Sequence, residues 1–464
     1  MRRAPFLVFL LSFWAATALT KPLWADTFAY IPSSGNDKVI RVATDSGEFT
    51  SATIAADSTC GPYGAAVAPN GRFVLVSCAT SGNIVALYDV DFTATSDAVP
   101  SGQIYTSDSA VSLRGVAIEP QSKYVYFANF KEDLVTGSVL RASASNPGDQ
   151  TSFLEANVGN APMGIAAVRA SDDTVVKVYV ANYSDGSVTV LTDNGTTLTT
   201  NTINSVGLNP VGVAASPDGL YIYVANYTNN AGGTVAMIST LTDTVVRLAN
   251  VGLGPWGVAV GSRGSYLYVT NSGDNTVSVL SAQTLTLVNT YTVGTQPFGI
   301  AAPKNGDFAY AINNSGIPIS NIEKTQIGFS VNNINNDSDH PIQSPYALGA
   351  FIGGLPPDAP SDLKGTAKSY DTIDLSWTDN SSDELGFFLE RREKGDSNYT
   401  VIATLDANVT TYSDEPLSGG ITYEYRIRAF NECAESDYAT ASGTSAITTQ
   451  EGGFSWCFIG TMLQ

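Results

Sequence analysis

The fold is decided by a stretch that reads Gly254-Pro255-Trp256-Gly257-Val258-Ala259-Val260, then Tyr266-Leu267-Tyr268-Val269-Thr270-Asn271, then Thr276-Val277-Ser278-Val279-Leu280. Each part has the β-branched and aromatic content of a short strand, and Gly and Asn residues mark the turns between the parts. A fourth segment, Leu287-Val288-Asn289-Thr290-Tyr291, is needed to reach the next similar stretch. Four consecutive strands joined by short turns predict one four-stranded antiparallel sheet.

The same unit recurs at intervals of roughly 45 residues, a period typical of propeller blades. Its first strand begins with Pro-x-Gly or a variant, at Pro62–Gly64, Leu113–Gly115, Pro162–Gly164, Pro210–Gly212, Pro255–Gly257, Pro297–Gly299 and Pro345–Ala347. Repeats of four strands predict an all-β fold, a β-propeller. We predict seven blades, with six or eight as alternatives because the repeat lengths vary.

The two ends of the repeat region complement each other. The seventh of these first strands, from Tyr346 to Ile352, is not followed by the second, third and fourth strands of a unit. The segments Phe28–Ile31 and Lys38–Val42 look like later strands of a blade that lacks its first. We therefore predict that the N- and C-terminal strands share one blade, which closes the ring and removes exposed sheet edges.

The motif Tyr268-Val269-Thr270-Asn271 is the one that names the YVTN β-propeller repeat proteins, and residues 179–182 and 223–226 are close variants of it. Residues 26–353 therefore resemble this family. The resemblance implies an exported or surface-layer-associated propeller of bacteria or archaea. Related folds include sugar lactonases and quinoprotein or amine dehydrogenases, so the resemblance selects no activity.

A second domain follows a Pro-rich break in composition at residues 354–360, which we interpret as a linker. Residues 361–449 contain short alternating strands and suit a small β-sandwich. They resemble a bacterial fibronectin type III module, which implies that Trp377 and Tyr425 fill the core and that Tyr423 is the corner tyrosine. These aromatic residues are expected to serve packing.

Both ends of the chain look like sorting segments. Residues 1–25 have Arg2 and Arg3, a short apolar run and small residues before Ala25, which is typical of a cleaved export signal. An uncleaved anchor is the alternative. Residues 450–464 are Gly-rich and contain Cys457-Phe458-Ile459, which resembles a C-terminal sorting-type box but lacks the full Cys-Phe-Ile-Ala-Thr-Ala pattern. Modification of Cys457, pairing with Cys433 and no role all stay open. The expected location is periplasmic, secreted or cell-surface.

The charge balance argues against two classes of function. Asp and Glu number 43 against 23 Lys and Arg, which gives a net charge of −20, and signal removal would take it to about −23. So acidic a chain would repel nucleic acid. A single His, His340, argues against a His-based triad or a multi-His metal site. The run 335–341 is rich in Asn and Asp, whose side-chain oxygens could bind Ca²⁺. It lacks the Gly and distal Glu of a helix-loop-helix calcium site.

One mouth of the predicted channel collects the residues between Pro and Gly, because those positions begin each innermost strand. The candidate ligand-binding residues are Tyr63, Arg114, Met163, Trp256, Phe298 and Tyr346, with Val211 at the remaining position. Such a rim could stack a sugar ring while Arg114 meets a carboxylate or phosphate. The alternative is that these side chains pack between blades and Arg114 neutralises an acidic rim. Cys60 and Cys78 flank a hairpin turn, so they form either a disulfide or two buried thiols.

The sequence therefore predicts an exported, non-enzymatic, surface-associated binding or scaffold protein. We predict no catalytic residue, no transition metal and no cofactor, and the expected partner is an extracellular protein or a glycan. Two alternatives stay open. One is an enzyme acting at the channel mouth, either a lactonase-like hydrolase or a quinoprotein-like dehydrogenase. The other is a structural protein of a surface layer.

Overall fold

In the computed structural model the described residues run from 27 to 447, apart from 45, 54–59, 70, 72, 89–103, 107–111, 132–135, 145–152, 170–174, 230–231, 307, 327, 336–337, 354–355, 397, 432 and 441–445. The predicted signal (1–25) and tail (450–464), with Cys457, lie outside these residues. No helix in the described ranges is long and apolar enough to cross a membrane.

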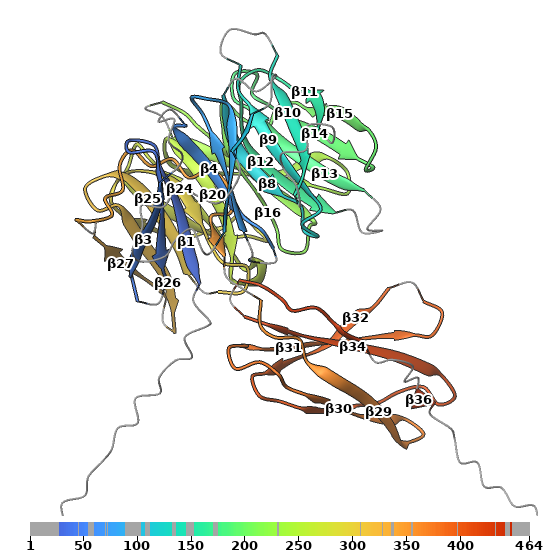
Figure 1. Ribbon diagram of the computed structural model, residues 1–464. Helices are drawn as coiled ribbons and strands as arrows, with labels where there is room; N and C mark the ends of the chain where they lie inside the picture. Colours follow the sequence, from blue (N-terminus) through green and yellow to red (C-terminus); the bar gives the residue numbers. More distant parts are fainter. Residues whose placement is uncertain are drawn as a thin grey trace, which may run out of the picture.

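The described residues between 27 and 353 form a ring of sheets (Figure 1) that contains seven four-stranded antiparallel sheets. The first strands of these sheets surround a central channel. From the channel outward, the first sheet contains β28 (Ile352–Gly353), β1 (Phe28–Ser33), β2 (Lys38–Ala43) and β3 (Phe49–Thr53). The second contains β4 (Pro62–Val67), β5 (Phe73–Cys78), β6 (Asn83–Tyr88) and β7 (Ile104–Thr106). The third contains β8 (Leu113–Ile118), β9 (Tyr124–Asn129), β10 (Ser138–Ser143) and β11 (Leu154–Asn157).

The remaining four sheets of the ring repeat this order. The fourth contains β12 (Pro162–Arg169), β13 (Val176–Asn182), β14 (Ser187–Asp193) and β15 (Leu198–Ile203). The fifth contains β16 (Pro210–Ala215), β17 (Tyr221–Asn226), β18 (Gly232–Ser239) and β19 (Thr244–Leu253). The sixth contains β20 (Pro255–Gly261), β21 (Tyr266–Asn271), β22 (Thr276–Ser281) and β23 (Leu287–Thr292), and the 3-10 turn η3 (Ser262–Gly264) connects β20 to β21. The seventh contains β24 (Thr295–Ala301), β25 (Phe308–Ser315), β26 (Ile319–Thr325) and β27 (Gly328–Ile334).

The ring closes through its first sheet, where the two ends of the repeat region meet. Strand β28 pairs antiparallel with β1, so that Phe28 lies opposite Gly353 and Ala29 opposite Ile352. The backbone N–H of Tyr30 also donates to the carbonyl of Phe351 at 2.8 Å. The strand that ends the repeat region therefore occupies the innermost position of the sheet that begins it.

The Gly of each Pro-x-Gly start lets neighbouring first strands approach closely. A Cβ atom on Gly64 would collide with the carbonyl oxygen of Arg114, the residue between Leu and Gly in the next sheet. The same relation continues around the ring in the pairs Gly115–Met163, Gly164–Val211, Gly212–Trp256 and Gly257–Phe298. Only Gly permits such an approach of backbone to backbone. The repeated Gly therefore sets the residues between Pro and Gly side by side at one mouth.

The repeated Tyr of the second strands links several sheets to the next one. The hydroxyl of Tyr126 donates to Asp193 at 2.7 Å, and that of Tyr223 donates to the carbonyl of Ala282 at 2.8 Å. Asp193 also accepts a hydrogen bond from Arg141 at 3.1 Å, and both of these charged groups are buried. Burial raises the pKa of Tyr126 well above its ordinary value, so this phenol stays a neutral donor.

The described residues between 356 and 447 form a sandwich beneath the ring (Figure 1). Its three-stranded sheet contains β29 (Ser361–Ser369), β30 (Thr372–Thr378) and β33 (Thr411–Asp414). The other sheet contains β31 (Gly386–Glu393), β32 (Thr400–Asp406), β34 (Thr422–Phe430), β35 (Ala439–Thr440) and β36 (Ala446–Ile447). Trp377 and Tyr425 lie in its core, and Tyr423 accepts a hydrogen bond from the backbone N–H of Ser418, as a corner tyrosine does.

Candidate functional site

One mouth of the ring holds a pocket of about 500 Å³. Five of the six sequence-predicted rim residues line it: Tyr63, Arg114, Met163, Trp256 and Tyr346. Phe298 does not line this pocket. It stacks on Tyr346, with ring centroids 5.4 Å apart, and lies 5.0 Å from the ring of Trp256. Val211 is fully buried in the same cluster as Tyr63 and Met163. We call these seven positions the inner ring.

A second set of side chains surrounds the inner ring, and the sequence analysis missed it. These residues lie at the end of each second strand, directly after the position that Asn occupies in five sheets. The backbone N–H groups of Phe130, Tyr183 and Tyr227 each donate to the carbonyl of the residue that precedes the first strand of the same sheet. These carbonyls belong to Ser112, Ala161 and Asn209. Phe130 and Tyr183 line the pocket, and Tyr227 packs in the same cluster. An aromatic residue directly after Asn in three repeats is the sequence signal that could have predicted this second set.

The two sets complement each other, and together they make an aromatic cup. Where the inner residue is aromatic, the outer residue of the same sheet is small or polar, as in Tyr63 with Ala79, Trp256 with Ser272, Phe298 with Asn314 and Tyr346 with Ser34. Where the inner residue is not aromatic, the outer residue is, as in Arg114 with Phe130, Met163 with Tyr183 and Val211 with Tyr227. Every sheet of the ring therefore contributes one aromatic side chain to the cup.

Arg114 is the cationic group of the cup. Its guanidinium carbon lies 4.5 Å from the ring centroid of Tyr63 and 5.0 Å from that of Phe130. Its Nε is buried without a hydrogen-bond acceptor, and so is the indole Nε1 of Trp256. Burial raises the pKa of Tyr63 above its ordinary value while Arg114 acts in the opposite direction, so Tyr63 remains a neutral phenol.

The Asn residues that end the second strands bond to their own turns. Asn271 donates to Thr276 at 3.0 Å and to Ser278 at 2.9 Å, and its Oδ1 accepts a hydrogen bond from the N–H of Gly252. Equivalent amide donors are Asn129, Asn182, Asn226 and Asn313. Each Asn thus ties the end of a second strand to its own turn, and Asn271 also ties it to the segment that leads into the first strand.

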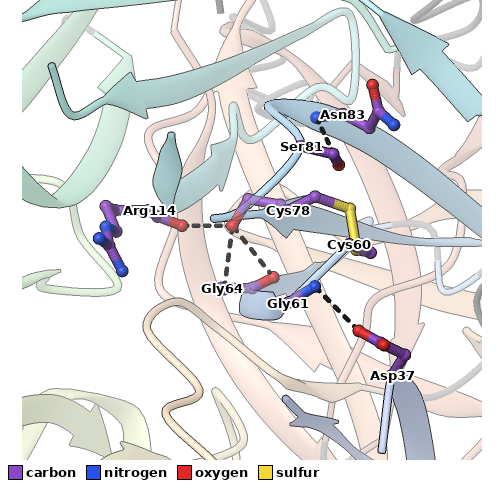
Figure 2. Close-up of a disulfide and its surroundings, with 9 residues drawn as sticks. Asp37, Cys60, Gly61, Gly64, Cys78, Ser81, Asn83 and Arg114 are labelled. Atoms are coloured by element: carbon purple, nitrogen blue, oxygen red, sulfur yellow. Dashed lines mark hydrogen bonds between the residues drawn. A yellow bond between two sulfur atoms is a disulfide. The ribbon is translucent and has the colours of Figure 1, made fainter. Parts of the chain in front are cut away.

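The second sheet makes the equivalent connection covalently. Cys78 occupies the position of the Asn, and it forms a disulfide with Cys60, just before Pro62 (Figure 2). Beside it, the hydroxyl of Ser77 donates to the carbonyl oxygen of Arg114, whose side chain points away from the disulfide (Figure 2). The disulfide therefore fixes the backbone that carries Tyr63 and supports the backbone of Arg114.

The opposite mouth has a different lining. A cavity of about 320 Å³ within the channel is lined mainly by small apolar side chains of the first strands, with Lys304 and Cys433 among its polar lining residues. Residues of the sandwich lie against this mouth. Lys304 pairs with Glu435 at 2.6 Å, and Asn305 donates to the carbonyl of Asn431 at 2.9 Å. The guanidinium of Arg263 lies 4.8 Å from the ring centroid of Phe430.

The other predicted sites are less developed. Within the described ranges, no group of three or more His, Cys, Asp and Glu side chains is placed to hold a metal ion. Two residues of the acidic run, 336 and 337, lie outside those ranges, so calcium stays a prediction. Cys433 contacts Thr27, with 3.4 Å between Sγ and Oγ1, and the structure does not describe Cys457.

The comparison with protein families identifies the sandwich. A family model described as the fibronectin type III domain matches residues 358–442. The chain therefore carries a fibronectin type III domain. No curated protein is similar enough to the chain to count as a match.

Solved structures resemble the ring. A functionally unknown protein from Desulfotomaculum acetoxidans is 16% identical with a TM-score of 0.53, covering 71% of this chain and 98% of its own. A Bacteroides fragilis protein, provisionally assigned as a 6-phosphogluconolactonase, is 15% identical with a TM-score of 0.53, covering 70% of this chain and 97% of its own. Propeller-like proteins are among the neighbours, and at these identities the likeness concerns the fold alone.

Proposed function

We propose that this chain is an exported, non-enzymatic binding protein of a bacterial or archaeal surface, in which the cup takes an extracellular ligand. In this proposal residues 26–353 form a seven-bladed propeller of the YVTN repeat type. The linker 354–360 joins it to the fibronectin type III domain, residues 361–449. The observation that carries the proposal is the convergence of aromatic side chains from all seven sheets on one mouth of the ring.

The groups that line the cup are suited to binding. Aromatic faces stack on sugar rings and on other flat apolar surfaces, while a few placed polar groups fix orientation. Trp256 and Tyr183 supply such faces, and Thr80, Ser184 and Arg114 supply polar groups. The pocket volume of about 500 Å³ lies within the range of small-ligand sites. A short glycan segment matches both the volume and the lining.

The position of the fibronectin type III domain supports the same proposal. It lies against the mouth opposite the cup, through Lys304, Asn305 and Arg263, and so leaves the cup accessible. Fibronectin type III domains are compatible with a binding or scaffold role, and a disulfide between Cys60 and Cys78 is compatible with an oxidising, extracytoplasmic location. The domain would then act as a second contact surface or as a support.

The test is a glycan and cell-wall binding array with the full chain, its Trp256→Ala variant and a matched control. Leu248→Ala is the control, because Leu248 is 55% exposed on the outer strand β19. We expect the array signals to be lost in Trp256→Ala and kept in Leu248→Ala. Equal signals in all three proteins would contradict the proposal. Large ordered oligomers in light scattering, or turnover of lactones, would favour the surface-layer or the enzymatic alternative instead.

A further inference from the structure

Two arginines of the ring have the same aromatic contact and differ in their ion pairing. The guanidinium of Arg141 lies 4.3 Å from the ring centroid of Tyr124 and also donates to Asp193 at 3.1 Å. Arg114 lies 4.5 Å from the ring centroid of Tyr63, and no described carboxylate pairs with it. Arg141 thus shows how a structural arginine is ion-paired in this fold, while its Nε, like that of Arg114, has no hydrogen-bond partner. Arg114 has the stacking half of that arrangement and lacks the anionic half.

Asp37 and Asp185 lie within three residues of the pocket-lining Ser34 and Ser184, and both accept hydrogen bonds from backbone groups. Asp37 accepts a hydrogen bond from the N–H of Gly61 at 3.0 Å, and Asp185 accepts one from the N–H of Asn160 at 2.7 Å. Tyr63 cannot supply the missing charge, because it stays a neutral phenol. Arg114 forms no ion pair with a described carboxylate, so its guanidinium is available to an anionic ligand even though the chain has a net charge of −20.

The stacking also fixes how this charge is presented. Rings on both sides of a guanidinium cover its faces and leave its edge, which carries the N–H donors. That edge forms two parallel hydrogen bonds with a planar carboxylate. Arg114 is only partly buried and lines the pocket, so a ligand carboxylate in the cup can reach this edge.

We infer that the ligand of the cup is a carboxylated sugar, such as a uronic acid unit of an acidic glycan, and that Arg114 determines specificity by binding its carboxylate. This inference rests on the proposed binding function. One guanidinium compensates the single charge of a carboxylate, whereas a phosphate dianion would keep excess negative charge in an acidic protein. The hydroxyl-bearing residues Thr80 and Ser184, together with the aromatic faces, suit the sugar ring.

The experiment is calorimetric titration of the full chain with an oligogalacturonate, a neutral galactose oligomer of equal length and a galactose phosphate. The variants are Arg114→Gln, Arg114→Lys and the control Arg247→Gln, whose side chain is exposed on β19. Losing a hydrogen bond to a charged group should weaken oligogalacturonate binding about 10- to 100-fold in Arg114→Gln. Binding of the neutral oligomer should change less than about threefold. Arg114→Lys should recover only part of the loss, because an ammonium cannot form the planar pair.

The outcomes separate this inference from the proposed function. Preference for the oligogalacturonate that Arg114→Gln removes and Arg247→Gln keeps would support the inference. Equal binding of acidic and neutral oligomers, both lost in Trp256→Ala, would overturn the inference and leave the cup a glycan site. Preference for the phosphate would also overturn it. Absence of binding by all three probes, with Arg114→Gln folded as judged by its thermal unfolding, would overturn the carboxylated-sugar assignment, while the binding array still tests the cup.

Discussion

The two mouths of the ring receive the two ends of the same seven first strands and present different surfaces. At the starts of these strands, aromatic side chains and Arg114 form the cup. Toward their ends, Ala, Val and Ile side chains line a narrow cavity, and residues of the fibronectin type III domain lie against it. The repeats thus carry similar small apolar side chains at the mouth next to the fibronectin type III domain, and their side chains differ at the cup.

This difference indicates how the fold separates stability from binding. The recurring features, the Gly contacts and the Tyr bonds between sheets, occupy positions that packing determines. The residues between Pro and Gly, and those after the Asn, differ from sheet to sheet, and their side chains gather at one mouth. We therefore expect changes outside the cup to lower stability while the folded protein still binds, and changes in the cup to do the reverse.

The largest effect is expected at a buried ion pair away from the cup. Asp193→Ala would leave Arg141 buried without its partner, where the side-chain exposures are 7% for Arg141 and 0% for Asp193. Breaking such a pair costs about 3–5 kcal/mol of unfolding free energy. Urea unfolding measures the loss, and the folded variant should keep its ligand affinity. The control is Glu155→Ala, a more exposed partner of Lys131, which should cost under about 1 kcal/mol. Equal losses in both variants would contradict the distinction.

The next largest effect concerns the disulfide. Cys60→Ser with Cys78→Ser removes a link between residues 18 apart in sequence, which should cost about 3 kcal/mol. Combining Cys60→Ser with Cys78→Asn should recover part of this loss, because Asn ends the second strand in four other sheets and bonds to its turn. Thermal unfolding of both double variants measures the difference. If Asn stabilises no better than Ser, the disulfide does not replace the Asn bonds.

A smaller free-energy effect is expected on binding. Tyr183→Ala removes one aromatic face of the cup and should weaken ligand binding about tenfold, or roughly 1.4 kcal/mol. Its unfolding free energy should change little, because the Tyr183 side chain is only partly buried. Asn305→Ala at the opposite mouth is the control, and its affinity should equal that of the unaltered chain. A loss of affinity in Asn305→Ala as large as in Tyr183→Ala would remove the functional difference between the mouths.

The smallest effect is expected between the ring and the fibronectin type III domain. The side chain of Lys304 is 44% exposed in its pair with Glu435, so Lys304→Ala should cost under about 1 kcal/mol. Calorimetric unfolding measures this cost. Lys368→Ala, in a more exposed pair with Asp374 inside the domain, is the control. A loss above about 2 kcal/mol in Lys304→Ala alone would show that docking of the domain stabilises the ring more than a surface ion pair can.

The sequence predicts the features that repetition makes visible. The Pro-x-Gly starts indicate the first strands, and the residues between them predict most of the pocket lining. Phe130 and Tyr183 escaped prediction, because only the fold shows that a residue after one strand reaches the mouth formed by another. The docking of the fibronectin type III domain was also beyond prediction. It depends on contacts such as Lys304 with Glu435, which lie far apart in sequence and in different domains.

The central claim is that the cup, and no other surface, binds the ligand through Arg114 and the surrounding aromatic rings. A crystal structure of the full chain soaked with an oligogalacturonate tests this most directly. The account predicts a sugar ring against Trp256 and Tyr183, with its carboxylate within hydrogen-bonding distance of the Arg114 guanidinium. A sugar bound at the opposite mouth or on the fibronectin type III domain, with the cup empty, would contradict it.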